Sequence, residues 1–104
     1  SDQCRTVLER LGVLDCFEFI VEARGALHKS RPEVFACCME RLGGTDPAGC
    51  AVCEDAVYAA STAHEAGYYV IGIADAASAA DAPRMQSICD QFLPRWDALD
   101  WKKI

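Results

Sequence analysis

The sequence lacks three features that would place it in a well-marked class. Its longest basic cluster is Lys102-Lys103, and 16 Asp and Glu outnumber 10 Lys and Arg, for a formal net charge of −6. A nucleic-acid-binding domain needs a basic stripe instead. No apolar run approaches the roughly 18 residues of a membrane span, and the first residues lack the basic and apolar segments of a signal peptide. We therefore expect no nucleic-acid partner and no membrane partner.

The composition that is present is that of an ordinary globular domain. A chain of 104 residues is long enough for one domain. Its 52% hydrophobic and 25% charged residues argue against disorder. We expect a single domain over residues 1–104.

The cysteines indicate a reducing compartment rather than a disulfide scaffold. Their number, seven, is odd, and their density lies below the about 8–10% of disulfide-rich chains. Most stand where an apolar residue would fit, so we predict reduced core thiols in a cytoplasmic protein. They are Cys4, Cys16, Cys37, Cys38, Cys50, Cys53 and Cys89.

Cys50 and Cys53 have the spacing of a redox or zinc pair. A redox pair prefers its first thiol at a helix N-terminus, where the helix dipole lowers the thiol pKa. This pair lies inside a short apolar run, and no second Cys/His pair supplies the other two ligands of a zinc site. We favour a structural role and keep redox activity as an alternative.

Four segments repeat apolar residues with the 3.6-residue period of a helix. Glycine or proline stands at their ends: Gly12, Pro32, Gly67 and Pro94. The third segment carries a stripe of alanines, which lets a helix approach its neighbour closely. The predicted helices span residues 2–12, 32–43, 56–66 and 83–93.

Three short runs between these helices are apolar on both faces, as buried parallel strands are. The alternation of helix and strand implies right-handed crossovers and a parallel sheet covered on both sides. We therefore predict the α/β class. The predicted strands span residues 17–21, 50–53 and 69–73.

Charged residues follow each predicted strand. Lys29 lies on the loop after the first, Glu54 and Asp55 follow the second, and Asp75 follows the third. Ligands of open parallel sheets bind beyond the carboxyl ends of the strands, so these side chains are expected at one edge. Carboxylates with a lysine suit a divalent cation and an anionic group. Asp75 has an alternative role as a cap of the following loop.

Three segments match one family in order and spacing. Residues 8–21 are similar to Leu-Glu-x-Leu-Gly-Leu-x-Asp-Tyr-Phe-Asp, and residues 29–35 to Lys-Pro-x-Pro-Asp-Ile-Phe. Residues 53–73 are similar to a segment that begins Glu-Asp-Ser and ends Val-Ile-Gly-Val. Together they resemble haloacid-dehalogenase-like (HAD) phosphatases of the β-phosphoglucomutase and phosphoglycolate-phosphatase branch. The resemblance implies an incomplete Rossmann-like (HAD-like) core.

The resemblance also implies chemistry through a covalent aspartyl-phosphate. In the family, one Asp attacks phosphorus, a second Asp acts as acid and base, and a Lys with Mg²⁺ neutralises the transition state. By motif position, Lys29 is that lysine and Asp55 is a Mg²⁺ ligand. Glu54 is a second ligand or the partner that orients the first. The implied substrate is a phosphorylated small molecule. His28 has no motif role.

The chain departs from the family by substitution and by absence. Ser30 replaces a proline, Ala56 a serine and Ala59 a glycine. The nucleophile motif Asp-x-Asp-x-Thr/Val and the substrate-selecting cap are missing. We expect the C-terminal half of a HAD core, inactive alone, that docks on the missing N-terminal half or a second copy.

The family sheet places two strands between 17–21 and 50–53, so an isolated chain could instead close that gap by pairing the two. The alternative function is a non-catalytic α/β interaction or structural module.

Overall fold

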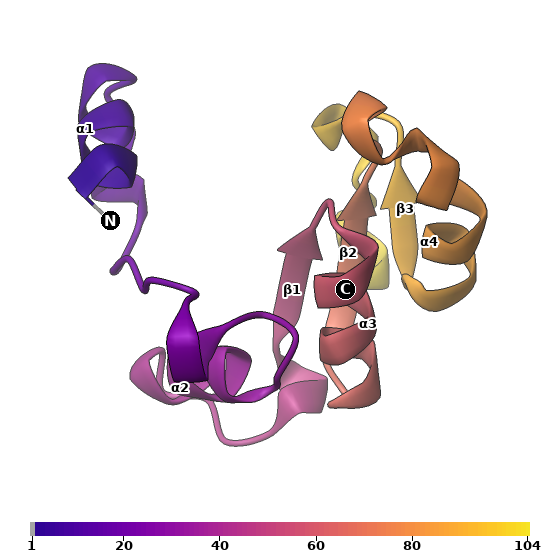
Figure 1. The fold of residues 1–104 in the computed structure, drawn as a ribbon, viewed down its shortest axis with the longest axis horizontal. Helices are drawn as coiled ribbons and strands as arrows, with labels where there is room; N and C mark the ends of the chain where they lie inside the picture. The colour runs from indigo at the N-terminus through magenta and orange to yellow at the C-terminus, as the bar shows by residue number, and fades with distance from the viewer. Residues whose placement is uncertain (1) are drawn as a thin grey trace.

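The computed structural model describes residues 2–104, which form an α/β fold with four α-helices and a three-stranded parallel sheet (Figure 1). Ser1, the first residue of the predicted domain, lies outside the described residues. No helix within residues 2–104 has both the length and the apolar character needed to cross a membrane. The elements are α1 (Asp2–Arg10), α2 (Glu33–Arg41), β1 (Ala51–Glu54), α3 (Val57–Glu65), β2 (Tyr69–Ile73), α4 (Ala82–Ile88) and β3 (Gln91–Leu93).

The sheet has the order β1-β2-β3, and both pairings are parallel. Val52 lies opposite Val70, and Gly72 lies opposite Phe92. Helix α3 connects β1 to β2 and α4 connects β2 to β3, so both connections are the crossovers that parallel strands require. All three strands therefore end at the same edge of the sheet (Figure 1).

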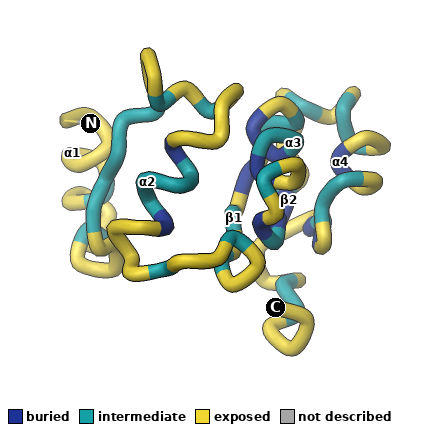
Figure 2. Tube along the Cα trace, turned by 90° about the horizontal axis from the view of Figure 1, so that it is seen from below, coloured by how far each residue is buried: buried dark blue, intermediate teal, exposed yellow. Residues whose placement is uncertain are grey.

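The core lies between the sheet and helices α3 and α4. The predicted alanine stripe is confirmed, because Ala59, Ala60 and Ala63 are fully buried. Val70 of β2 and Met85 of α4 complete the most deeply buried set. Figure 2 shows buried residues on the sheet, α3 and α4 and also on α2, where Val34 and Met39 are buried, while α1 is mostly exposed.

The predicted helix 83–93 is wrong in its second half, because α4 ends at Ile88 and β3 begins at Gln91. Cys89 has an extended backbone (ψ 144°). Asp90 donates its N–H to the carbonyl of Val70 at 2.8 Å, and its carboxylate accepts the Val70 N–H at 2.8 Å. These two hydrogen bonds between Asp90 and Val70 join the chain to β2, and the residues that follow continue as strand β3. Phe92 therefore belongs to β3, although its spacing fits the helical period.

The predicted strand 17–21 is also wrong, because this segment is irregular. A parallel strand needs a neighbour that satisfies its backbone groups. Within residues 2–104, no strand pairs with this segment or with the outer edge of β1. The chain thus does not close the gap by pairing the two. The segment contacts α2 instead, where the Arg41 guanidinium lies 4.0 Å from the centre of the Phe19 ring.

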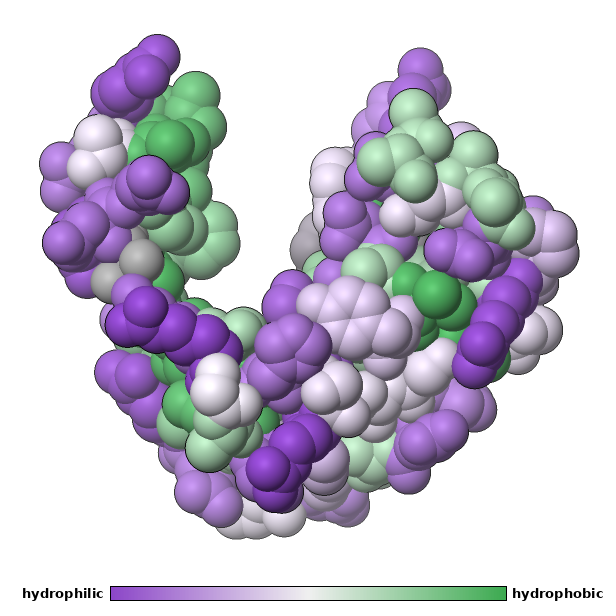
Figure 3. All heavy atoms as spheres, in the orientation of Figure 1, coloured by the Kyte–Doolittle hydropathy of each residue, from purple (hydrophilic) through white to green (hydrophobic). Residues whose placement is uncertain are grey.

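Residues 2–21 form an arm, here called the α1 arm, that stands apart from the sheet (Figure 1). None of the residues of α1 is buried. Large apolar side chains of the arm are exposed, namely Val7, Leu11 and Phe17. Figure 3 shows a hollow between the arm and the rest of the molecule, with apolar surface on the side of the arm that faces it.

The predicted core position of the cysteines is wrong for the three exposed thiols, whereas Cys50 and Cys89 pack against the core. All seven are free thiols, and none is fully buried. Cys4 and Cys16 are exposed because they lie on the α1 arm, and Cys53 is exposed at β1. Cys37, Cys38, Cys50 and Cys89 are half-buried.

We predict that Gly72→Ala destabilises the fold by about 1–3 kcal/mol, as overpacking of a core does. A Cβ at Gly72 would lie 2.6 Å from the Cys89 Sγ and 3.0 Å from side-chain atoms of Met85 and Phe92. Urea unfolding measures the loss. Gly49→Ala is the matched control, since a Cβ there meets no atom within 4 Å.

The double variant Gly72→Ala/Cys89→Ala should recover part of the lost stability, because it removes the nearest atom. Equal unfolding midpoints for Gly72→Ala and Gly49→Ala would contradict this account of the packing.

Candidate functional site

A pocket of about 330 Å³ lies at the edge where the three strands end. Its walls come from the ends of β1 and β2, from the segment after β3 and from the loop before α2. The lining residues are Lys29, Cys53, Glu54, Asp55, Ile73 and Trp96. The structure thus brings Lys29, Glu54 and Asp55 to one pocket.

The centre of this pocket is an ion pair between Lys29 and Glu54. The Lys29 Nζ donates to the Glu54 Oε2 at 2.9 Å. The Glu54 side chain is only 5% exposed, whereas that of Lys29 is 35% exposed. The other oxygen of Glu54, Oε1, accepts the N–H groups of Asp55 at 3.1 Å and of Ala56 at 3.4 Å. Both carboxylate oxygens of Glu54 are therefore hydrogen-bonded, which favours its role as an orienting partner.

The ion pair shifts the pKa values of Lys29 and Glu54 in the directions that favour their charged forms. Burial alone would raise the pKa of Glu54, but hydrogen bonds from Lys29 and Asp55, the Lys29 charge and the Ala56 amide hold it below its usual value. Burial alone would lower the pKa of Lys29. The hydrogen bond to Glu54 and the charges of Glu54, Tyr58 and Asp55 raise it instead. Both groups are charged at neutral pH.

A second set of contacts holds the loop that carries Lys29. The Ser30 N–H donates to the His28 Nδ1 at 3.1 Å, and the Ser30 Oγ lies 2.9 Å from the same nitrogen. The His28 ring stacks on Tyr58 in α3, with ring centres 5.6 Å apart. The sequence pattern gave His28 no role and identified Ser30 only as a departure from the family, whereas the two residues are hydrogen-bonded to each other. A His two positions before a Ser was the available signal.

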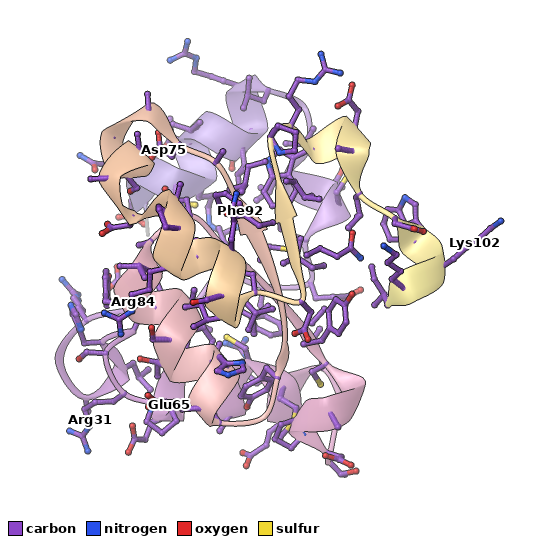
Figure 4. The ribbon with its side chains drawn as sticks, turned by 90° about the vertical axis from the view of Figure 1, so that its right-hand side faces the viewer. Arg31, Glu65, Asp75, Arg84, Phe92 and Lys102 are labelled. Atoms are coloured by element: carbon purple, nitrogen blue, oxygen red, sulfur yellow. The ribbon has the colours of Figure 1, made fainter. Side chains whose placement is uncertain are left out.

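Asp75 lies outside this pocket. Its carboxylate accepts the N–H of Ala77 at 3.3 Å and so caps the 3₁₀ turn Ala76–Asp81. Figure 4 shows Asp75 at the turn that precedes α4, above Phe92. Both residues line a different pocket. The structure therefore gives Asp75 the capping role.

Cys53 lines the pocket as an exposed thiol. Partial desolvation of the thiol by the atoms around it, together with the charge of Glu54, raises its pKa. A raised pKa lowers the thiolate fraction at neutral pH, which disfavours the redox alternative for the Cys50 and Cys53 pair.

The site contains two carboxylates, Glu54 and Asp55, that could contribute to a Mg²⁺ site. Across residues 2–104 there is no group of three or more His, Cys, Asp or Glu side chains arranged to hold a metal ion. Mg²⁺ commonly uses one or two carboxylates, with water and phosphate oxygens completing its octahedron. The exposed Asp55 in an open pocket fits this kind of site, while a cage made wholly of protein ligands does not form.

No family model, no curated protein and no solved structure matches this chain. The HAD resemblance therefore remains a prediction from the three motif segments, two of which contribute side chains to the pocket.

We predict that Lys29→Met destabilises the fold by about 1–3 kcal/mol at about pH 7, because it leaves the buried Glu54 carboxylate without its cation. The pKa of Glu54 in the folded protein is lowered from 4.5. The ion pair therefore stabilises the fold above pH 4.5, and this stabilisation is lost as the pH falls through the lowered pKa. The raised pKa of Lys29 keeps its contribution present below pH 10.5. In urea unfolding, the free energies of unfolding of Lys29→Met and of the unchanged chain should therefore become equal as the pH is lowered into the acid range.

Lys102→Met is the matched control for the lost charge. Lys102 is exposed on the C-terminal turn and points away from the body of the molecule (Figure 4). The Lys102→Met substitution should leave the free energy of unfolding unchanged both at neutral pH and in acid. A Lys29→Met loss that is the same in acid and at neutral pH would contradict the ion-pair account.

Proposed function

We propose that this chain is the lysine- and magnesium-binding half of a HAD-like phosphatase or phosphomutase core. The observation that supports this most directly is the meeting of Lys29, Glu54 and Asp55 in one pocket where the strands end. These three residues come from two of the three motif segments. Their charges suit a phosphoryl group and a divalent cation.

The residues have distinct roles in this proposal. Lys29 binds an oxygen of the phosphoryl group, and its raised pKa keeps it a cation rather than a base. Glu54 fixes the position of the ammonium group through the 2.9 Å bond. Asp55 supplies a carboxylate oxygen to Mg²⁺, which when bound neutralises and orients the phosphoryl group. His28 and Ser30 hold the lysine loop.

The nucleophile must come from outside this sequence. The family places two strands between residues 17–21 and β1, and the hollow beside the free edge of β1 leaves room for them. A strand paired to β1 in parallel would end next to Glu54, where an attacking aspartate is required. A second copy of this chain lacks the Asp-x-Asp motif. The missing N-terminal half is therefore the favoured partner.

A non-catalytic α/β module is the second candidate, favoured by the absence of the nucleophile motif from this sequence. The two candidates differ in what is encoded upstream. An Asp-x-Asp-x-Thr/Val motif followed by a helical cap supports the enzyme, and its absence from the complete reading frame supports the module.

We predict that the 104-residue chain alone does not hydrolyse p-nitrophenyl phosphate in the presence of Mg²⁺, because it lacks the attacking carboxylate. Release of p-nitrophenol measures this. Addition of an upstream segment that carries the nucleophile motif should restore turnover. Mg²⁺-dependent turnover by the chain alone would refute the proposal.

In the complete enzyme, Asp55→Ala should abolish metal-dependent activity. Lys29→Ala should lower kcat by roughly 10²-fold or more, as the loss of a charge-stabilising group does. Asp75→Ala is the matched acidic control and should keep nearly full activity, because Asp75 caps a turn outside the pocket. Full activity in Asp55→Ala or Lys29→Ala would refute the assigned roles.

A further inference from the structure

The pocket has an aromatic wall in addition to its charged residues. Trp96, the first residue of the 3₁₀ turn Trp96–Ala98 after β3, lines the pocket together with Lys29. It is 51% exposed. The other tryptophan, Trp101, is 77% exposed and is not among the lining residues. A large aromatic side chain that is half open to a polar pocket offers a ring face to a ligand.

The segment that carries Trp96 is anchored at its C-terminal end. The Gln91 side chain of β3 donates to the carbonyl of Asp100 at 2.9 Å and accepts the Asp100 N–H at 3.0 Å. The Leu99 N–H donates to the Trp96 carbonyl at 3.2 Å. The chain from Gln91 to Asp100 is thus a closed loop on the sheet. The backbone that carries Trp96 is therefore fixed to the sheet before any ligand arrives, which lowers the entropic cost of binding.

The order of the strands sets the distance that a ligand must bridge. Glu54 ends β1 and Ile73 ends β2, and Trp96 follows β3. Neighbouring strands are about 4.8 Å apart, so the end of β3 lies roughly 10 Å from the end of β1. The pocket volume of about 330 Å³ lies at the lower end of small-molecule pockets, which are about 300–1,000 Å³. It therefore has room for a group beyond a phosphate.

We propose that Trp96 stacks on a planar ring of the substrate, so that the pocket takes phosphate esters whose alcohol carries an aromatic or heteroaromatic ring. Nucleoside monophosphates have this chemistry. The proposal rests on the proposed function for the phosphoryl end, where Lys29 binds. Ile73 lies between the two ends and provides an apolar surface under the linker between phosphate and ring.

The test is binding to the 104-residue chain, read by tryptophan fluorescence. Trp101→Phe leaves Trp96 as the single reporter, and it should bind as the unchanged chain does. The phosphorylated probes are glycerol 3-phosphate, inorganic phosphate and adenosine 5′-monophosphate, each with Mg²⁺, and adenosine is the probe without a phosphate. Adenosine monophosphate should bind roughly tenfold more tightly than the other two, which is the size of effect expected from one stacked base.

Trp96→Ala should remove this tenfold preference, and Trp96→Phe should keep most of it. Binding of Trp96→Ala is followed by calorimetry, with inorganic phosphate affinity unchanged as the sign that the fold and the Lys29 end are intact. Equal affinity for adenosine monophosphate and glycerol 3-phosphate would overturn the stacking proposal. The absence of any binding would overturn it as well.

The two proposals fail in different ways. If phosphate binding needs Lys29 but no ring preference exists, the stacking role of Trp96 is wrong and the proposed function stands. If adenosine binds as tightly as its monophosphate and Lys29→Ala has no effect, the phosphoryl assignment is wrong and the stacking role stands.

Discussion

The ion pair between Lys29 and the buried Glu54 carboxylate is the interaction on which the site depends. It joins the loop before α2 to the end of β1, two segments 25 residues apart in sequence. A charge as buried as that of Glu54 costs free energy that the pairing only partly returns, and an apolar pair would serve packing equally well. The pair is therefore better explained by the positioning of an ammonium group than by stability.

The same carboxylate also determines what the start of α3 can do. The N–H groups of Asp55 and Ala56 donate to Glu54, so the backbone donors before the helix are already used. Those two N–H groups are thus not available to an anion in this pocket, whereas Lys29 lines it as a cation. Because Asp55 follows Glu54 directly and donates its N–H to it, the backbone of Asp55 is fixed beside the pocket.

Sequence patterns predicted the features that depend on local signals. The predicted bounds of β2 are confirmed. The alanines of α3 are buried together, because their spacing places them on one face of a helix. The patterns failed where a distant contact decided the outcome. β3 depends on the bonds between Asp90 and Val70, which periodicity does not encode. Residues 17–21 have the composition of a strand, but a strand forms only beside a partner.

In the site, too, the sequence predicted what local patterns and sheet topology determine and missed what distant contacts determine. Lys29, Glu54 and Asp55 could be placed together because the carboxyl ends of parallel strands share one edge. The sequence could not predict that His28 stacks on Tyr58 or that Trp96 lines the pocket. Both contacts depend on the three-dimensional path of a loop relative to the sheet. A histidine or tryptophan in a polar loop carries no periodic signal, so the three-dimensional path of the loop is needed to find it.

Three requirements of the molecule meet on one side of β1. The free edge of this strand leaves backbone groups without a strand partner within residues 2–104, and such edges favour the addition of another strand. The α1 arm exposes Val7, Leu11 and Phe17, and the side of the arm that faces the hollow is apolar (Figure 3). The proposed chemistry requires a carboxylate beside Lys29, and the sequence has no motif that provides it. The two parallel strands that the proposed function places between β1 and the arm would pair the edge, cover the apolar surface and end at the pocket. One insertion that meets a backbone, a packing and a chemical requirement together is a simpler account than three separate partners.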